Sequence, residues 1–150
     1  MRLHSYIAKQ FADPQGVGGS LISFVMNRQN RPLYDATERL LSLSHDDSVL
    51  DIGCGNGFVM GLLAHQSGAT LTGIDPSDEI IKTALRRNRK YVERKTMRFD
   101  CQNVSAMTFP AESFSRAYTI NTVYFWEELD KPMKEIWRVL EPGGVFINTL

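Results

Sequence analysis

The sequence predicts an α/β fold built on a mostly parallel sheet. Short apolar runs alternate with segments of helical periodicity along residues 48–150, which is the pattern of strand–helix–strand units with right-handed crossovers. A glycine-rich segment, GCGNG at 53–57, directly follows the first apolar run. Ligands of such sheets bind beyond the carboxyl ends of the strands, so this segment marks the expected binding edge.

Five apolar runs are the predicted strands, because each has the length of a buried strand and ends at a turn or helix signal. They are SVLDI (48–52), ATLTGI (69–74), TMRF (96–99), SRAYTI (115–120) and GVFINTL (144–150). Helices are predicted between them at about 57–67, 77–91 and 130–140.

Capping residues support the last two helices. Ser77 precedes the second helix as a candidate N-cap, and Asp130 does the same for the third. Pro142-Gly143-Gly144 is the expected stop of the third helix. Residues 1–47 have helical apolar spacing and are predicted to form a lid segment of the same domain, whose ligand-binding part is 48–150.

Composition limits the function. A chain of 150 residues is one domain, and its formal net charge of zero draws it neither to nucleic acid nor to anionic lipid. Two cysteines, Cys54 and Cys101, suggest a reducing compartment. No apolar run approaches the roughly 20 residues of a membrane span, and the histidines have no metal-ligand spacing. We therefore expect a cytoplasmic protein that binds no metal and no nucleic acid.

The glycine segment has the spacing Gly53-x-Gly55-x-Gly57, with Asp51 just before it. A dinucleotide site usually has GxGxxG, which places a pyrophosphate at a helix N-terminus. A carboxylate would repel a neighbouring pyrophosphate, whereas it would attract the ammonium and sulfonium groups of S-adenosylmethionine. The charge of Asp51 therefore favours S-adenosylmethionine over a nicotinamide cofactor.

Asp75 ends the second predicted strand, about twenty residues beyond the glycines. An acidic residue at this place can accept hydrogen bonds from both ribose hydroxyls of an adenosine cofactor. Capping of the next helix is the alternative role, although Ser77 is already suited to it.

Three segments in order, VLDIGCGNG, GIDPSDEII and EIWRVLEPGG, resemble the class I S-adenosylmethionine-dependent methyltransferases, in particular the small-molecule group that includes ubiquinone and menaquinone biosynthesis enzymes. The resemblance covers about residue 48 to the end of the chain. It implies a Rossmann-like, doubly wound sheet with strand order 3-2-1-4-5, followed in the family by a helix and two more strands.

The resemblance also implies which residues hold the cofactor. The glycine loop would surround the methionine moiety, and Asp75 would hold the ribose. The residues after the second and third strands would pack against the adenine. Asn103 stands where the family often has an aspartate on the adenine amine, and Asn121 would line the place of methyl delivery. The implied set is Asp51, Gly53, Cys54, Gly55, Gly57, Asp75, Pro76, Ile80, Asn103, Val104, Asn121 and, from the preceding helix, Tyr34.

Other roles remain open for some of these residues. Asp51 could be a solvated strand end, and Tyr34 could serve helix packing. Tyr124, Phe125 and Trp126 could line an acceptor pocket or join the core.

No catalytic residue is assigned, because transfer of a sulfonium methyl group needs alignment of a nucleophile more than a base. The function predicted is methyl transfer to a small, partly apolar acceptor. The alternatives are a non-catalytic cofactor-binding module and, less favoured, a nicotinamide-dependent oxidoreductase.

The chain ends inside the fifth predicted strand, at Leu150. We expect a form that lacks the family's last two strands and leaves strand five as an open edge. Such apolar edges pair with other chains, so a homodimer through this edge, or marginal stability, is expected.

Overall fold

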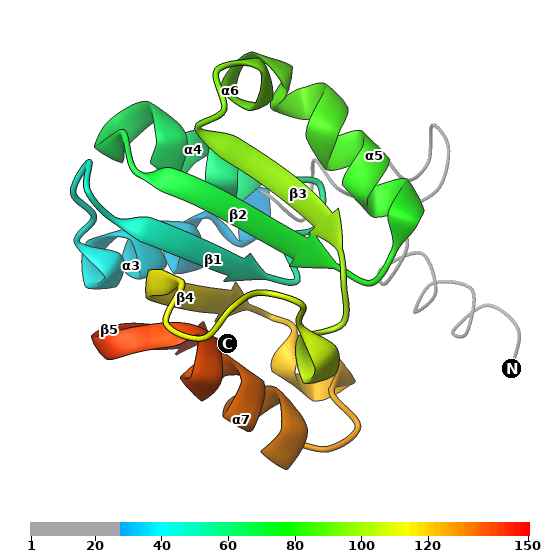
Figure 1. Cartoon of the computed structure of the whole chain (residues 1–150). Helices are drawn as coiled ribbons and strands as arrows, with labels where there is room; N and C mark the ends of the chain where they lie inside the picture. Colours follow the sequence, from blue (N-terminus) through cyan, green and yellow to red (C-terminus); the bar gives the residue numbers. More distant parts are fainter. Residues whose placement is uncertain (1–27) are drawn as a thin grey trace, which may run out of the picture. The chain divides into compact units, whose positions relative to one another are not determined.

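The central feature of the molecule is a five-stranded parallel sheet (Figure 1). The computed structural model describes residues 28–150. The strand order is β3-β2-β1-β4-β5, and each neighbouring pair is parallel. The strands are β1 (Ser48–Ile52), β2 (Thr70–Asp75), β3 (Met97–Cys101), β4 (Phe114–Ile120) and β5 (Leu140–Thr149). The predicted fold class and strand order are confirmed.

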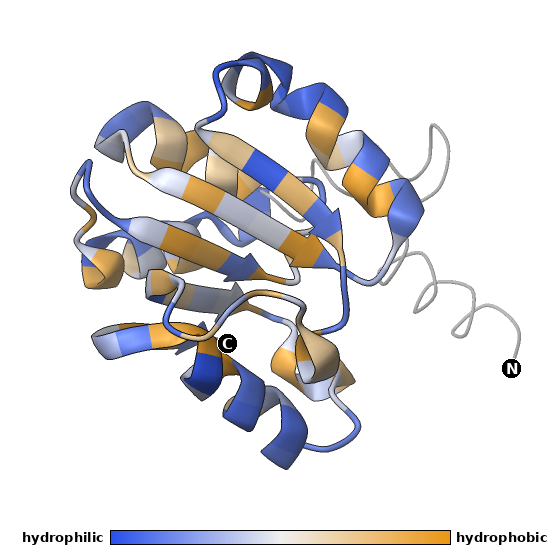
Figure 2. Cartoon of the chain, viewed as in Figure 1, coloured by the Kyte–Doolittle hydropathy of each residue, from blue (hydrophilic) through white to orange (hydrophobic). Residues whose placement is uncertain are grey.

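Helices cover both faces of this sheet because each strand is followed by a crossover. The helical elements are α3 (Arg31–Leu41), α4 (Phe58–Ser67), α5 (Asp78–Arg87), α6 (Arg89–Glu93), η1 (Val104–Ala106), η2 (Val123–Phe125) and α7 (Asp130–Val139). One core cluster joins α3, α4 and α5 to the sheet, and a second joins η1 and α7 to it. Figure 2 shows apolar positions along β1 and β2 and hydrophilic positions along α5 and α7. Residues Leu33–Leu150 form one compact unit.

The helix predicted at 77–91 is two helices, α5 and α6, which meet at Asn88. Asn88 is buried, and its side-chain amide donates to the carbonyl oxygens of Ala84 (3.1 Å) and Gly57 (3.0 Å). An asparagine side chain that bonds to nearby backbone competes with the helical hydrogen bonds. The break therefore ties the end of α5 to the start of α4.

The expected role of Pro142-Gly143-Gly144 as a helix stop is wrong. Helix α7 ends at Val139, and β5 begins at once with Leu140. The three residues lie inside β5, where the register against β4 shifts between Phe114 and Arg116. Because β5 is an edge strand, it tolerates a proline and a bulge.

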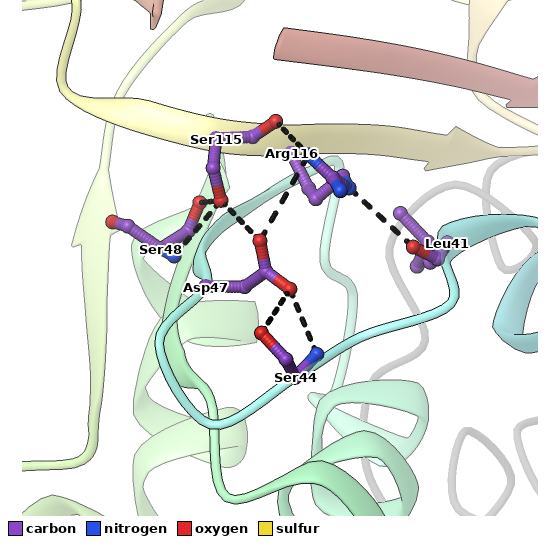
Figure 3. A network of polar contacts seen from close by, with 6 residues as sticks. All are labelled: Leu41, Ser44, Asp47, Ser48, Ser115 and Arg116. Carbon is purple, nitrogen blue, oxygen red and sulfur yellow. Dashed lines mark hydrogen bonds and ion pairs between the residues drawn. The ribbon is translucent and has the colours of Figure 1, made fainter.

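A polar network fixes the link between α3 and β1, at the edge opposite the glycine segment (Figure 3). The buried Asp47 carboxylate accepts hydrogen bonds from the Ser115 hydroxyl (2.7 Å) and from the backbone and hydroxyl of Ser44 (2.8 and 3.0 Å). Burial raises the pKa of Asp47, but these hydrogen bonds and the Arg116 guanidinium outweigh it and leave the pKa below its usual value. The network anchors β1 to β4, and Arg116 also donates a hydrogen bond to the carbonyl oxygen of Leu41, the last residue of α3, at 3.4 Å.

Candidate functional site

The glycine segment folds as a loop over the carboxyl end of β2. All three glycines have left-handed backbone, with φ of 76° at Gly53, 52° at Gly55 and 70° at Gly57. The backbone N–H groups of Gly53 and Cys54 donate to the Ile74 carbonyl oxygen, at 2.8 and 3.0 Å. Residues with a Cβ rarely adopt this backbone, which explains the alternation of glycines.

Two of the glycines are needed for packing, and the third is not. A Cβ at Gly53 would lie 2.5 Å from Thr122 Cγ2, and a Cβ at Gly57 would lie 2.5 Å from Asn88 Nδ2. Among residues 28–150, a Cβ at Gly55 would meet nothing within 4 Å. The loop backbone is therefore open to an approaching ligand at Gly55, which is the place that the sequence predicts for the methionine moiety.

Asp51 lies in β1, immediately before the loop, and is 4% exposed. The Tyr118 hydroxyl, from the neighbouring β4, donates to Asp51 Oδ2 at 2.7 Å. Burial raises the pKa of Asp51 to about 7, with the Tyr118 hydrogen bond lowering it and the nearby Asp75 charge raising it. Asp51 is therefore a buried residue and not a solvated strand end.

Cys54, inside the loop, is buried as well. Burial, with the charges of Asp51 and Asp75, raises the pKa of its thiol well above the usual value. The thiol is therefore neutral, and Cys54 fills space beneath the loop.

Asp75 ends β2 and connects the loop to the next helix. Its Oδ2 accepts from the Gly55 backbone N–H at 3.3 Å, and its Oδ1 accepts from the Ser77 backbone N–H at 3.0 Å. Ser77 caps α5 as predicted, because its hydroxyl oxygen accepts from the Ile80 backbone N–H at 3.4 Å. Asp75 therefore lies at the corner between the glycine loop and α5.

The residues expected around the adenine lie beyond β2 and β3. Pro76 is exposed and Ile80 half-buried, whereas Val104 is buried in η1. Asn103 is exposed and caps η1, with its Oδ1 accepting from the Ser105 backbone N–H at 2.8 Å. The two segments are in contact, because the Cys101 thiol lies 3.4 Å from the Pro76 carbonyl oxygen.

Asn121 follows β4 at the same edge of the sheet and has left-handed backbone, with φ of 57°. Its backbone N–H donates to the Thr149 carbonyl oxygen at 2.9 Å, and its Oδ1 accepts from the Tyr124 hydroxyl at 2.6 Å. Asparagine tolerates this backbone better than most residues. Hydrogen bonds therefore hold both the backbone and the side chain of Asn121. The neighbouring Thr122 lies against the loop at Gly53.

The aromatic residues after Asn121 separate into two environments. Tyr124 and Phe125 are 60% and 66% exposed, with ring centroids 5.5 Å apart. Trp126 is half-buried against the second core cluster. Trp126 therefore belongs to the core. Tyr124 and Phe125 are exposed and can contact an acceptor.

Tyr34 on α3 is buried against Phe58, the first residue of α4, with ring centroids 5.9 Å apart. The Arg87 guanidinium lies 5.6 Å from the Phe58 ring centroid. Tyr34 thus packs directly behind the glycine loop, although the residues that precede 28 in the predicted lid lie outside the described residues.

Tyr118, Thr122 and Asn88 support the loop, a role that the sequence patterns do not predict. Tyr118 carried a weak signal, a polar aromatic residue in an otherwise apolar strand. Its partner became evident only from the register, in which Asp51 lies opposite Tyr118. Within residues 28–150, no group of three or more His, Cys, Asp or Glu side chains could hold a metal ion. No helix in that range is long and apolar enough for a bilayer.

Comparison with known proteins agrees with this geometry. A family model described as a methyltransferase domain matches residues 50–148. The uncharacterized methyltransferase YdaC of Bacillus subtilis (strain 168) is 30% identical over 125 residues, which cover 83% of this chain and 67% of YdaC. The sterol 4-C-methyltransferase strm-1 of Caenorhabditis elegans is 43% identical over 110 residues, covering 71% of this chain and 32% of strm-1.

A solved structure shows the same fold. The geranyl diphosphate C-methyltransferase of Streptomyces coelicolor A3(2), in complex with Mg²⁺, geranyl diphosphate and S-adenosyl-L-homocysteine, has a TM-score of 0.67 and 21% identity, covering 76% of this chain and 42% of that one. The chain spans about two thirds of the length of YdaC and about a third of strm-1. It belongs to the methyltransferase-domain family, the S-adenosylmethionine-dependent methyltransferases.

Proposed function

We propose that this chain binds S-adenosylmethionine at the glycine loop and transfers its methyl group to a small, partly apolar acceptor. The observation that carries the proposal is the open backbone at Gly55, with the buried carboxylates of Asp51 and Asp75 on either side. A cationic ligand without phosphate suits this pair of acids, whereas a pyrophosphate would be repelled. A nicotinamide cofactor is therefore disfavoured.

Residues of the loop's neighbouring elements would hold the cofactor in three places. Asp51 would attract the ammonium and sulfonium charges, and Asp75 would accept from the ribose hydroxyls. Pro76, Ile80, Asn103 and Val104 would surround the adenine. Cofactor sites combine apolar side chains with a few fixed polar groups, and Pro76, Ile80 and Val104 would supply the apolar part.

When bound, the cofactor supplies an electrophilic methyl group. The chain's own contribution is to orient the two reactants and to exclude water from them. Asn121, with its backbone and side chain both held, would form the wall at the acceptor side. Among the residues named here, none is assigned as a general base.

The acceptor is proposed to be partly apolar, because Tyr124 and Phe125 expose their rings beside Asn121. The sterol acceptor in the name of strm-1 supports the same class. A cytoplasmic location is proposed because both cysteines are free, Cys54 buried and Cys101 exposed.

Calorimetric titration tests the cofactor, and a turnover assay tests the reaction. We expect micromolar binding of S-adenosylmethionine and of S-adenosylhomocysteine, and none of NAD. Transfer of a labelled methyl group should occur to members of a panel of sterols, isoprenoids and phenols. Binding without transfer to any of them would favour the non-catalytic binding module. Tighter binding of NAD would overturn the proposal.

A further inference from the structure

Asp51 and Tyr118 form a buried polar pair on neighbouring strands. They lie opposite each other in the register of β1 and β4, and the Tyr118 hydroxyl donates to Asp51 Oδ2 at 2.7 Å. Tyr118 is 0% exposed and belongs to the core cluster beneath α3 and α4. A buried tyrosine hydroxyl needs a hydrogen-bond partner, and here that partner is the buried carboxyl group of Asp51, which adjoins the glycine loop.

We infer that Tyr118 is a positioning residue: its hydrogen bond from β4 holds the Asp51 carboxyl group at the glycine loop, where binding of the cationic cofactor displaces a proton from Asp51. The inference rests on the proposed function, in which Asp51 faces the positive charges of S-adenosylmethionine. The proton passes from the carboxyl group to the solvent, and no covalent bond to the ligand is formed.

Within the described residues, the titratable groups around Asp51 come from β2, β4, the glycine loop and α3. Asp75 from β2 and Tyr118 from β4 act on the Asp51 carboxylate directly. Cys54 from the loop interacts with Asp51 and Tyr118, and Tyr34 from α3 interacts with Tyr118. The Cys54 thiol and the Tyr118 phenol are neutral at physiological pH, since burial raises the pKa values of both well above the usual ones. Among residues 28–150, the charge that acts on Asp51 is that of Asp75, which raises the pKa of Asp51.

The balance between the two forms follows from these contacts. Burial and Asp75 favour the neutral carboxyl, and the Tyr118 hydrogen bond favours the carboxylate, which together place the pKa of Asp51 at about 7. An opposite charge nearby favours the ionised form of a carboxyl group. A bound ammonium or sulfonium therefore lowers the pKa of Asp51, and by linkage the ligand binds more tightly where Asp51 is already ionised.

Substitution of Tyr118 by Phe removes the hydrogen bond and keeps the ring in the core. In the parent, affinity for S-adenosylhomocysteine should fall about tenfold per pH unit below the pKa of Asp51. In Tyr118→Phe this decline should begin at higher pH, so that binding is several-fold weaker at pH 7 and close to the parent at pH 8. Tyr91→Phe, which removes a hydroxyl from α6, is the matched control and should follow the parent.

A purely structural role for Tyr118 gives a different result. The Tyr118→Phe variant would then bind more weakly by the same factor at every pH between 5.5 and 8, or would not differ from the parent. Either outcome overturns the inference. Asp51→Asn provides a second test, because its affinity should lose the acid decline whether or not Tyr118→Phe folds.

Proton release can be counted separately. Calorimetry in two buffers of different ionisation enthalpy should show release of about half a proton at pH 7, the amount expected for a group that titrates at about 7. The amine of the ligand can also exchange a proton on binding, so Asp51→Asn is measured alongside and the difference is attributed to Asp51. Equal release from the two proteins contradicts the inference, whereas absence of binding at every pH contradicts the proposed function instead.

Discussion

The backbone N–H of Gly55 donates to Asp75 Oδ2 at 3.3 Å, which joins the open point of the glycine loop to the end of the neighbouring strand. The same carboxylate accepts from Ser77 at the start of α5. Asp75 therefore shapes the loop in addition to its proposed contact with the ribose. A carboxylate with these two partners is fixed in orientation before a ligand arrives, which reduces the ordering cost of binding.

Asp75→Ala should weaken cofactor binding about tenfold to a hundredfold. A hydrogen bond to a charged group is worth about 1.5–3 kcal/mol, and each 1.4 kcal/mol changes affinity about tenfold. Calorimetric titration with S-adenosylhomocysteine measures the effect. Asp78→Ala, which removes an exposed acid from the first turn of α5, is the control and should bind as the parent does. Unchanged affinity in Asp75→Ala would show that the ribose lies elsewhere.

Gly55→Val should abolish cofactor binding and leave the protein folded. The side chain would occupy open space in the apo protein, although φ of 52° makes the backbone strained. Gly143→Val is a close control, because Gly143 also has positive φ, at 82°, and open space around it, but lies in β5. Both variants should lose some stability in thermal melts, and only Gly55→Val should lose binding. Equal affinities for the two would remove Gly55 from the site.

The strands and the order of the sheet could be predicted because each depends on local apolar runs and on the rule for crossovers. The positions of Asp51, Asp75 and the glycines could be predicted for the same reason, since each lies at the end of a strand. The Asp51–Tyr118 pair could not, because it depends on the register of two strands that are 67 residues apart.

The break at Asn88 and the bulge in β5 could not be predicted from local sequence patterns either. Asn88 lies in a run of good helix formers, and its side chain bonds both to Ala84 in the same helix and to Gly57, 31 residues away, a contact that no local pattern reveals. Pro142-Gly143-Gly144 is a common helix stop, but here the position of β5 at the sheet edge allows those residues to continue the strand.

Asn103→Asp should strengthen cofactor binding several-fold. The single carbonyl oxygen of Asn103 is already used by the Ser105 backbone N–H, so its amino group is the part that is presented outward. An aspartate could keep this cap with one oxygen and offer the second to the adenine amine, in a stronger charge-assisted hydrogen bond. The inosine analogue of S-adenosylhomocysteine, which lacks that amine, is the control ligand and should gain nothing. A gain for both ligands would point to overall charge as its cause.

Asp51→Asn should stabilise the unliganded protein at alkaline pH. The pKa of Asp51 is raised from 3.8 to about 7 by burial, so the folded protein keeps a proton that the unfolded chain loses at lower pH. Stability therefore falls as pH rises from about 4 to about 7, and stays lower above that. Asparagine cannot ionise, so at pH 8 the variant should exceed the parent by about 2–4 kcal/mol in denaturant unfolding. Asp46→Asn, at an exposed site, should show no such gain.

The edge strand β5 should mediate self-association. β5 is ten residues long, lies at the edge of the sheet and exposes Val145, and the exposed Leu150 follows it. Unpaired edges present a row of free backbone donors and acceptors to other chains, and a lysine on the edge prevents such pairing. Light scattering should therefore detect dimers of the parent, and Val145→Lys should convert them to monomers. Leu40→Lys, which places the same charge on an exposed apolar residue of α3, should leave the dimer intact. A parent that stays monomeric at high concentration, or a dimer that Leu40→Lys dissociates and Val145→Lys does not, would place any contact away from this edge.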